Sequence, residues 1–508
     1  MSKRNSRDLW RLLSIAIASA VFVFGGVAMA QDDEEEVPMV SVMVVEDGAI
    51  VEMEVAEEEL AAFMEENTVL ATMGDAMAAS EEAATVQGNV DYIWLLLCGF
   101  LVFFMQAGFA TLEAGFIRQT GVVNSLTENF VDAGVTGVLW WAIGFGVAYG
   151  STVGGLFGAS NFFFSGLDSS GAYTDPALYR DFFFQFAFAA AASTIATGGM
   201  AERTNFVGKI IYSALVGAII YPVVVHWIWA GDGWLFGPGY NDFAGSAIVH
   251  MTGGILALIG AIFLGPRKGV DPKNPPRPHN LALATIGTSI LWFGWYGFNV
   301  GSTLAASDQG LMGLVATNTT IAAAAGSVTA LFFVYFTKGG KWDLSYSLNG
   351  SLAGLVGITA SCGFVAPWAS LLIGITSGVV LVISQDVVAN AGIDDAVGAF
   401  AVHGACGMVG VLSIGFFGIP TLTWSGTAGL FYGGGLGLLW FQFWGMLAVI
   451  AWVTVTAVVM FGALKAMGLL RISESGEDMG IDVYEHGATV WPDVLDIDAE
   501  KGSVAAGD

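Results

Sequence analysis

The sequence predicts an all-α polytopic membrane protein with eleven transmembrane helices. Of its 508 residues, 55% are hydrophobic and only 12% are charged, whereas soluble domains carry about 25% charged residues. Between residues 91 and 465, long apolar runs recur between short polar breaks. A run of about 18 residues can cross a hydrocarbon core of about 30 Å. The 69 glycines suit close packing of such helices.

Eleven runs meet this description, and the last of them is the longest. They occupy residues 92–117, 123–150, 181–200, 206–230, 242–265, 280–300, 310–337, 346–361, 367–387, 396–417 and 434–464. We expect them to form one membrane domain over residues 91–465, followed by an acidic cytoplasmic tail over 466–508.

The basic residues predict how the spans are oriented. Breaks after odd-numbered spans contain most of the Lys and Arg residues: Arg118, Arg203, Lys209, Arg267, Lys268, Lys273, Arg277, Lys338 and Lys341. Breaks after even-numbered spans contain Arg180 alone. Because Lys and Arg stay on the cytoplasmic side, the N-terminus of the mature chain is expected outside and the C-terminus inside.

The first 90 residues precede the membrane domain and divide into two segments. Residues 1–30 are basic, then apolar, and end in AMA, which predicts a cleavable signal peptide; an uncleaved transmembrane helix is the alternative. Residues 31–90 form an acidic exported extension. There the residues of MVSVMVV and AIVEMEV alternate in polarity, which predicts a β-hairpin, and AEEELAAFMEE predicts a helix. Disorder is the alternative, because acidic flanks also occur in disordered segments.

Acidic residues in the extension and the tail dominate the net charge of −27. Nucleic-acid binding would require a basic patch, so a nucleic-acid partner is excluded. The cysteines Cys98, Cys362 and Cys406 lie far apart in apolar segments, which fits neither a disulfide framework nor a zinc motif.

An internal repeat links spans five and ten. DFAGSAIVH and DDAVGAFAVH each place an aspartate eight residues before a histidine, Asp242 before His250 and Asp395 before His403. Spans 1–5 and 6–10 therefore read as two copies of one unit. Because five is odd, the second copy is inverted, and inverted repeats place a shared site near the bilayer midplane.

The two histidines are the first candidate site residues. A buried ionisable side chain is costly in a membrane unless it is paired or faces a cavity, and symmetry-related positions favour a functional pair over packing. Two neutral imidazoles can share one proton and still offer a donor and an acceptor to a small polar molecule. A metal would need three or four ligands, which the sequence does not supply. The sequence shows no nucleophile–base pair that would predict catalysis, so we do not expect an enzyme. We expect no cofactor.

Aromatic residues form the second candidate group, at the outer ends of spans three, four and six. They are Phe184, Phe188, Trp229, Trp295 and Phe298, with Ser302 nearby. Aromatic faces attract a cation, so their convergence predicts a cage; an interfacial aromatic belt is the alternative. Asp242 and Asp395 precede their helices, where a carboxylate caps backbone N–H groups.

Several motifs give the chain a specific resemblance across residues 91–490. It resembles the ammonium transporter family (Amt/Mep/Rh), bacterial Amt type. The matching stretches are GFATLEAGF at 108–116, FQFAFAAAAST at 184–194, AERTNF, DFAGSAIVH at 242–250, WFGWYGFNVGS at 292–302, NGSLAGLVGITA at 349–360, DDAVGAFAVHGACG at 394–407 and LRISESGEDMGIDVYEHG.

The resemblance implies a role for each candidate residue in transmembrane transport of ammonium or ammonia, with methylammonium as an analogue. His250 and His403 look like the paired pore histidines, and Phe188 and Phe298 like the gate above them. Phe184, Trp229 and Ser302 resemble an outer ammonium-recruitment site supported by Asp242. Trp295 and Asp395 are supporting residues. An ammonium sensor and a Rhesus-type neutral gas channel are the alternatives.

The resemblance also implies an assembly and a location. Family members are homotrimers in the lipid of the cell (inner) membrane, and their tails commonly dock a PII-type signalling protein. The tail here departs from the family pattern after EHG, with Ala488 and Trp491 followed by a further acidic segment.

Overall fold

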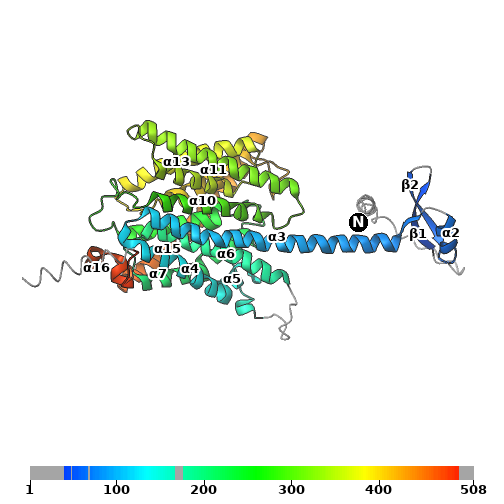
Figure 1. Ribbon diagram of the computed structural model, residues 1–508, viewed down its shortest axis with the longest axis horizontal. Coiled ribbons are helices and arrows are strands. Elements are labelled where there is room, and N and C mark those ends of the chain that lie inside the picture. Colours follow the sequence, from blue (N-terminus) through cyan, green and yellow to red (C-terminus); the bar gives the residue numbers. More distant parts are fainter. Residues whose placement is uncertain (1–38, 47–48, 67–68, 166–175, 491–508) are drawn as a thin grey trace, which may run out of the picture. The chain divides into compact units, whose positions relative to one another are not determined.

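The computed structural model describes residues 39–46, 49–66, 69–165 and 176–490. The chain divides into two compact units, Met1–Tyr92 and Ile93–Asp508, and both are drawn in Figure 1. The predicted signal peptide at 1–30 and the tail beyond residue 490 lie outside the described residues.

The first unit contains a small antiparallel sheet. Its elements are β1 (Met39–Glu46), β2 (Ala49–Ala56), α2 (Leu60–Glu66) and β3 (Val69–Thr72), and the strand order is β2-β1-β3. Alternation along the strands directs Val42 and Val55 into a small core, where Leu60 and Phe63 cover them. The boundary and the role of the extension stay predictions.

The second unit is a bundle of helices (Figure 1). Its helices are α3 (Met73–Phe116, which begins in the first unit), α4 (Val122–Leu139), α5 (Phe145–Tyr149), α6 (Pro176–Met200), α7 (Phe206–Leu215), α8 (Tyr221–Trp229), α9 (Thr252–Leu264), α10 (Leu281–Asn299), α11 (Gln309–Thr337), α12 (Leu344–Thr359), α13 (Pro367–Asn390), α14 (Cys406–Phe417) and α15 (Gly437–Ala466). Short 3-10 helices are η1 (Gln119–Gly121), η3 (Phe162–Phe164), η6 (Gly301–Thr303) and η8 (Leu430–Tyr432), and β4 (Thr152–Val153) pairs with β5 (Phe157–Gly158).

Ten helical segments among the described residues are long and apolar enough to cross a membrane, so the chain is a multi-pass membrane protein. They match ten of the predicted spans. The remaining predicted span, 346–361, corresponds to α12, which has only 16 residues and a length of about 24 Å. It is almost wholly buried against α10, α11, α13 and α14. The count of eleven crossings, the inverted arrangement and the orientation stay predictions.

Four π-helical turns interrupt the bundle: η2 (Trp140–Gly144), η4 (Val216–Ile220), η5 (Ser246–Met251) and η7 (Phe400–Ala405). Such turns are rare and occur often at functional sites. The last two occupy matching positions of the internal repeat, and each contains one of the two repeated histidines, His250 or His403.

The tail folds back on the ends of the helices that precede it. It contains α16 (Glu474–Met479) and α17 (Ile481–His486). The Asp482 carboxylate accepts hydrogen bonds from the backbone N–H groups of Val123 and Asn124, at 2.9 and 2.8 Å, at the start of α4. These groups have no partner within their own helix, so Asp482 satisfies donors that the α4 terminus leaves free.

Candidate functional site

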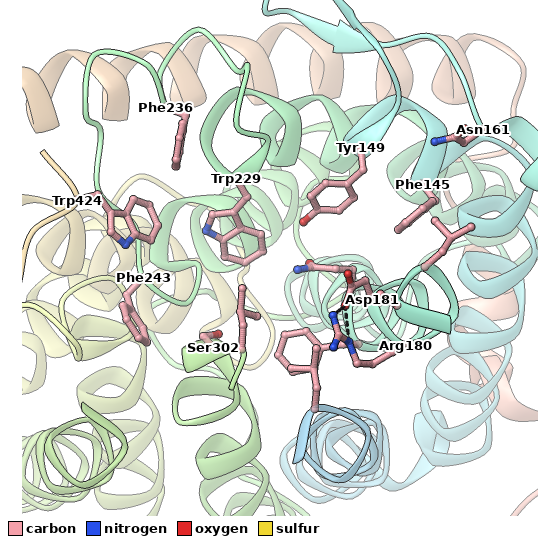
Figure 2. A pocket seen from close by; sticks show the side chains of 16 residues that line it. Phe145, Tyr149, Asn161, Arg180, Asp181, Trp229, Phe236, Phe243, Ser302 and Trp424 are labelled. Carbon is pink, nitrogen blue, oxygen red and sulfur yellow. Dashed lines mark hydrogen bonds and ion pairs between the residues drawn. The ribbon is translucent and has the colours of Figure 1, made fainter. Parts of the chain in front are cut away.

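An open cavity of about 550 Å³ lies at the end of the bundle where α8 stops. Three predicted residues, Phe184, Trp229 and Ser302, line it together. Figure 2 shows Trp229 and Ser302 facing the same space. They come from α6, α8 and η6, so the predicted convergence of three separate spans is present in the structure.

Two hydrogen bonds hold this group in place. The Trp229 indole Nε1 donates to the backbone oxygen of Asp242 at 2.8 Å, and the Ser302 hydroxyl donates to the Phe298 backbone oxygen at 2.8 Å. Because the Ser302 proton is used in that way, its oxygen remains an acceptor for a cationic N–H donor. The Trp229 face can attract the same cation.

Further residues line this cavity that the sequence did not single out. They are Tyr149, Asp181, Phe236, Phe243 and Trp424, and Arg180 lies among them, paired with Asp181 at 2.7 Å. Phe236, Phe243 and Trp424 lie between helices, where no helical periodicity marks them. The ion pair reduces the repulsion that Arg180 alone would exert on a cation.

Phe188 and Phe298 are in contact next to Phe184, which lines this cavity. Phe188 lies 4.8 Å from Phe184 and 4.1 Å from Phe298 between ring centroids. Both Phe188 and Phe298 are buried, and Phe298 also stacks on His250 at 5.3 Å. The rings of Phe184, Phe188, Phe298 and His250 are therefore in successive contact, and this row of rings is called the aromatic path below.

His250 and His403 are in direct contact. Their Nδ1 atoms lie 3.2 Å apart, and both rings are buried. One Nδ1 must carry a proton and the other must accept it, so the contact couples the two tautomers. Within the described part of the chain, the Nε2 atom of His250 has no hydrogen-bond partner. It can therefore donate to or accept from a small molecule in the path.

Trp295 fixes the orientation of the His250 ring. The two rings are stacked, with centroids 5.0 Å apart and planes inclined by 15°. The Trp295 Nε1 donates to the Thr359 hydroxyl at 2.8 Å, which ties the indole to the end of α12. Trp295 contacts His250 and does not line the cavity at the end of α8.

Glycines bring the two histidine segments together. A Cβ atom added to Gly254 would lie 2.2 Å from the Gly404 backbone nitrogen, a separation that atoms cannot adopt. The first turn of α9 and the turn η7 approach each other so closely because Gly254 has no side chain.

The two aspartates of the repeat cap the histidine-bearing turns. Asp242 is fully buried, and its two oxygens accept from the N–H groups of Gly245, Ser246, Ala247 and Ile248 at 2.8 to 3.1 Å. Asp395 accepts from Ala399 and Phe400 at 2.8 and 2.9 Å. Asp242 therefore does not line the outer cavity. It contacts that site only through its backbone oxygen, which holds Trp229.

An ion-pair network anchors the Asp395 segment. The neighbouring Asp394 carboxylate accepts three hydrogen bonds from Arg267, at 2.8 to 2.9 Å, and Arg267 also pairs with Glu202. Burial alone would raise the pKa of Asp394, but the hydrogen bonds and charge of Arg267, with the charge of Arg203, hold it below its usual value.

His226 was not among the predicted site residues, and its hydrogen bonds indicate a structural role. Its Nδ1 contacts the Ala148 backbone oxygen and its Nε2 the Thr152 hydroxyl, both at 2.8 Å. Both ring nitrogens are thus satisfied, one by the end of α5 and the other by β4. No group of three His, Cys, Asp or Glu residues within the described ranges could hold a metal ion.

Together these features define a class: a multi-pass membrane protein in which a row of contacting aromatic rings lies between an open cavity and a buried pair of imidazoles. Comparison with known proteins gives its family. The model of the Ammonium Transporter Family matches residues 93–491, and the chain belongs to this family.

Named relatives agree with this assignment. The chain is 40% identical over 455 residues to the ammonium transporter Amt2 of Archaeoglobus fulgidus, covering 85% of this chain and 95% of that protein. It is 37% identical over 440 residues to ammonium transporter 1 member 3 of Solanum lycopersicum, covering 80% and 94%. A solved structure described as a sensor Amt protein aligns with a TM-score of 0.73 at 35% identity, covering 79% of this chain and all of that one.

Proposed function

We propose that this protein transports ammonium across the membrane. Ammonium is recruited at Phe184, Trp229 and Ser302, loses a proton, and passes as neutral ammonia between Phe188 and Phe298 and along His250 and His403. The observation that carries this proposal is the contact of the two histidines at 3.2 Å, at the end of an aromatic path that begins in an open cavity.

Desolvation accounts for selectivity along such a path. Potassium has a similar size and charge to ammonium, and an aromatic face with a hydroxyl acceptor attracts both. A buried apolar path excludes a bare ion because the lost hydration is not replaced. Ammonium can release a proton and continue as a neutral molecule, whereas potassium cannot.

The paired imidazoles suit the neutral molecule. Each ring offers one nitrogen to the path while the other is used in the contact between the rings. They supply a donor and an acceptor without a fixed charge, which replaces the hydrogen bonds that ammonia loses on leaving water.

The test is a comparison of purified wild-type and variant proteins in proteoliposomes. His250→Ala, His403→Ala and the double variant should retain ammonium binding at the outer cavity but lose selective uptake and ammonium-driven current. His279→Ala is the matched control, because the hydrogen bond that the described residues give this histidine is to a backbone oxygen of Ile117. Selective uptake by the double variant at the wild-type rate would refute the mechanism.

The same family membership supports proposals for the assembly, the partner and the membrane. We propose a homotrimer in the cell inner membrane, with one path in each subunit. We also propose that the tail binds a PII-type protein, although it departs from the family pattern at Ala488 and Trp491. Native mass spectrometry in detergent tests the trimer, and co-purification with a PII-type protein tests the partner.

One solved relative favours a second candidate function. The sensor Amt protein matches over its full length, so the same fold can belong to a protein described as a sensor. A sensor would bind ammonium without sustained flux. Ammonium-driven current in proteoliposomes that contain only this protein would exclude a purely sensory role, and saturable binding with no current would support it.

A further inference from the structure

A second cluster of ionisable side chains lies buried among α3, α4, α6 and α7, outside the path described above. It contains Glu113, Glu128, Asp132 and Lys209, each no more than 4% exposed. The sequence analysis placed Lys209 in a polar break, but the structure places it inside α7. Its Nζ contacts Asp132 at 2.7 Å and the Ser213 hydroxyl at 2.9 Å.

Asp132 and Lys209 satisfy each other. The two Asp132 oxygens also accept from the hydroxyls of Ser193 and Thr194, at 3.0 and 2.9 Å. This pair is neutral overall and completely hydrogen-bonded on the carboxylate side, which is the arrangement that a buried ion pair requires.

Glu113 and Glu128 are in a different situation, because Lys209 is paired with Asp132 and neither glutamate forms an ion pair within the described residues. Glu113 Oε2 accepts from the Asn129 amide at 3.0 Å and the Thr197 hydroxyl at 2.9 Å. Across the described residues, Oε1 of Glu113 and Oε1 of Glu128 have no hydrogen-bond partner. The carboxyl groups of Glu113, Glu128 and Asp132 thus share the single positive charge of the Lys209 side chain. Binding of a proton to a glutamate removes excess negative charge, which is costly when it is buried.

A small cavity connects this cluster with the histidine pair. It has a volume of about 30 Å³ and is lined by Glu113, Thr194 and His403 among others. This volume has room for a water molecule, and the polar groups around it supply hydrogen-bond partners for one. His403 uses Nδ1 to contact His250, so its Nε2 is free to act towards another partner.

The cluster also approaches the tail. Asn124 lies one helical turn before Glu128 on α4, and its Oδ1 contacts His486 Nε2 at 2.9 Å. Asp482 is bound to the backbone of the same turn. His403 and Glu113 thus line one cavity, the charges of Glu113 and Glu128 interact, and Glu128 lies one turn from Asn124, which contacts His486.

We propose that Glu113 and Glu128 form a proton relay that carries the proton released by ammonium from the histidine pair towards the tail. The inference rests on the proposed transport function and adds two residues to it. An N–H bond of ammonium breaks and its proton binds to the histidine pair. An N–H bond of the protonated His403 ring then breaks, a water in the cavity transfers the proton, and an O–H bond forms at Glu113. The proton then passes to Glu128 and leaves near Asn124 and His486, which restores both carboxylates.

The relay is the reason that transport moves charge. Ammonia crosses between the histidines, while the proton takes the separate course through the glutamates. Loss of the relay should therefore uncouple the movement of charge from the entry of ammonia, which are coupled in the wild type. Charge movement should fall, while ammonia that enters without its proton should make the vesicle lumen more alkaline.

The experiment uses full-length protein in proteoliposomes that contain a pH-sensitive dye. After an ammonium concentration jump, current and lumenal pH are recorded for the wild type, Glu113→Gln and Glu113→Asp. Glu113→Gln keeps an acceptor for Asn129 and Thr197 but cannot bind a proton, so its current should fall about tenfold or more and the lumen should become alkaline. Glu113→Asp keeps a titratable carboxyl group and should retain part of the current.

The controls and the possible outcomes separate a failure of the relay from a failure of the transport function itself. Glu485→Gln, which removes a carboxylate bound only to Asn205, should keep the wild-type current. If Glu113→Gln does not fold, Glu128→Gln provides the same test, since its Oε1 has no partner to lose. Wild-type current in both glutamine variants, or equal loss of current in Glu113→Gln and Glu113→Asp, overturns the relay. Absence of ammonium current in the wild type overturns the transport function instead.

Discussion

His250 and His403 are separated by 153 positions in the chain, yet their Nδ1 atoms lie 3.2 Å apart. Each histidine lies on a π-helical turn. Each turn is capped by the aspartate that lies eight residues before its histidine. The contact therefore depends on two backbone irregularities that the caps stabilise. It also depends on the close approach of the glycines beside them.

Gly254→Ala should separate the two histidines. The added Cβ would lie 2.2 Å from the Gly404 nitrogen, so the two segments must move apart, at a cost of about 1–3 kcal/mol. We expect folded protein with strongly reduced ammonium current, measured in proteoliposomes. Gly462→Ala is the matched control, because its nearest neighbour would be 3.6 Å away. Wild-type current in Gly254→Ala would show that the close approach is not needed.

Trp229→Leu should weaken recruitment without stopping conduction. An aromatic face contributes about 0.5–2 kcal/mol to cation binding, which corresponds to an increase of about 2- to 30-fold in the apparent KM for ammonium. The maximal current should change less than KM. Trp229→Phe keeps an aromatic face and should lie between the wild type and Trp229→Leu. A lower maximal current at unchanged KM would instead assign Trp229 to a later step.

The residues of the path could be predicted from sequence where a local pattern marked them. The repeated spacing of Asp242 to His250 and of Asp395 to His403 identified the buried pair, because ionisable residues in apolar spans are costly. Phe184, Trp229 and Ser302 were identifiable at the ends of their spans. The structure brings these residues together as expected, while their roles stay predictions until transport is measured.

Other features could not be predicted because they depend on contacts between distant segments. The π-helical turns have no period in the sequence, and the packing of the 16-residue α12 against four other helices is visible only in the tertiary structure. Lys209 resembled a charge at a membrane boundary, but Asp132 on another helix allows its burial. Trp424 reaches the outer cavity from a segment between α14 and α15, and only the tertiary structure places it there.

Asp242→Asn should destabilise the turn η5. The carboxylate accepts from four backbone N–H groups, and an amide nitrogen in place of one oxygen would face two of these donors. Each buried donor left unsatisfied costs about 1–3 kcal/mol. We expect a lower unfolding temperature in detergent and a loss of current, since the same turn carries His250 and the Asp242 backbone holds Trp229. Unchanged stability would mean that the cap is dispensable.

Asp394→Asn should lower stability in a way that depends on pH. The bonds from Arg267 hold the pKa of Asp394 below its usual value, which is about 3.9 in an unfolded chain. A carboxyl group with a lowered pKa in the folded state contributes stability that is present above about pH 3.9 and is lost as the pH falls through the folded-state pKa. Removal of one partner of a buried ion pair costs about 3 kcal/mol, so Asp394→Asn should unfold at a lower temperature than the wild type at pH 7.

The measurement is the unfolding temperature in detergent at a fixed heating rate, taken at pH 7, 5, 4 and 3. The difference between wild type and Asp394→Asn should be constant from pH 7 to 5 and shrink at the lowest pH, because there the wild-type carboxylate becomes neutral. Asp386→Asn is the control: its partner Lys338 is near the surface, where an ion pair contributes little. A difference that persists undiminished at pH 3 would show that the Asp394 charge is not what holds this segment, and with it the Asp395 cap beneath His403, in place.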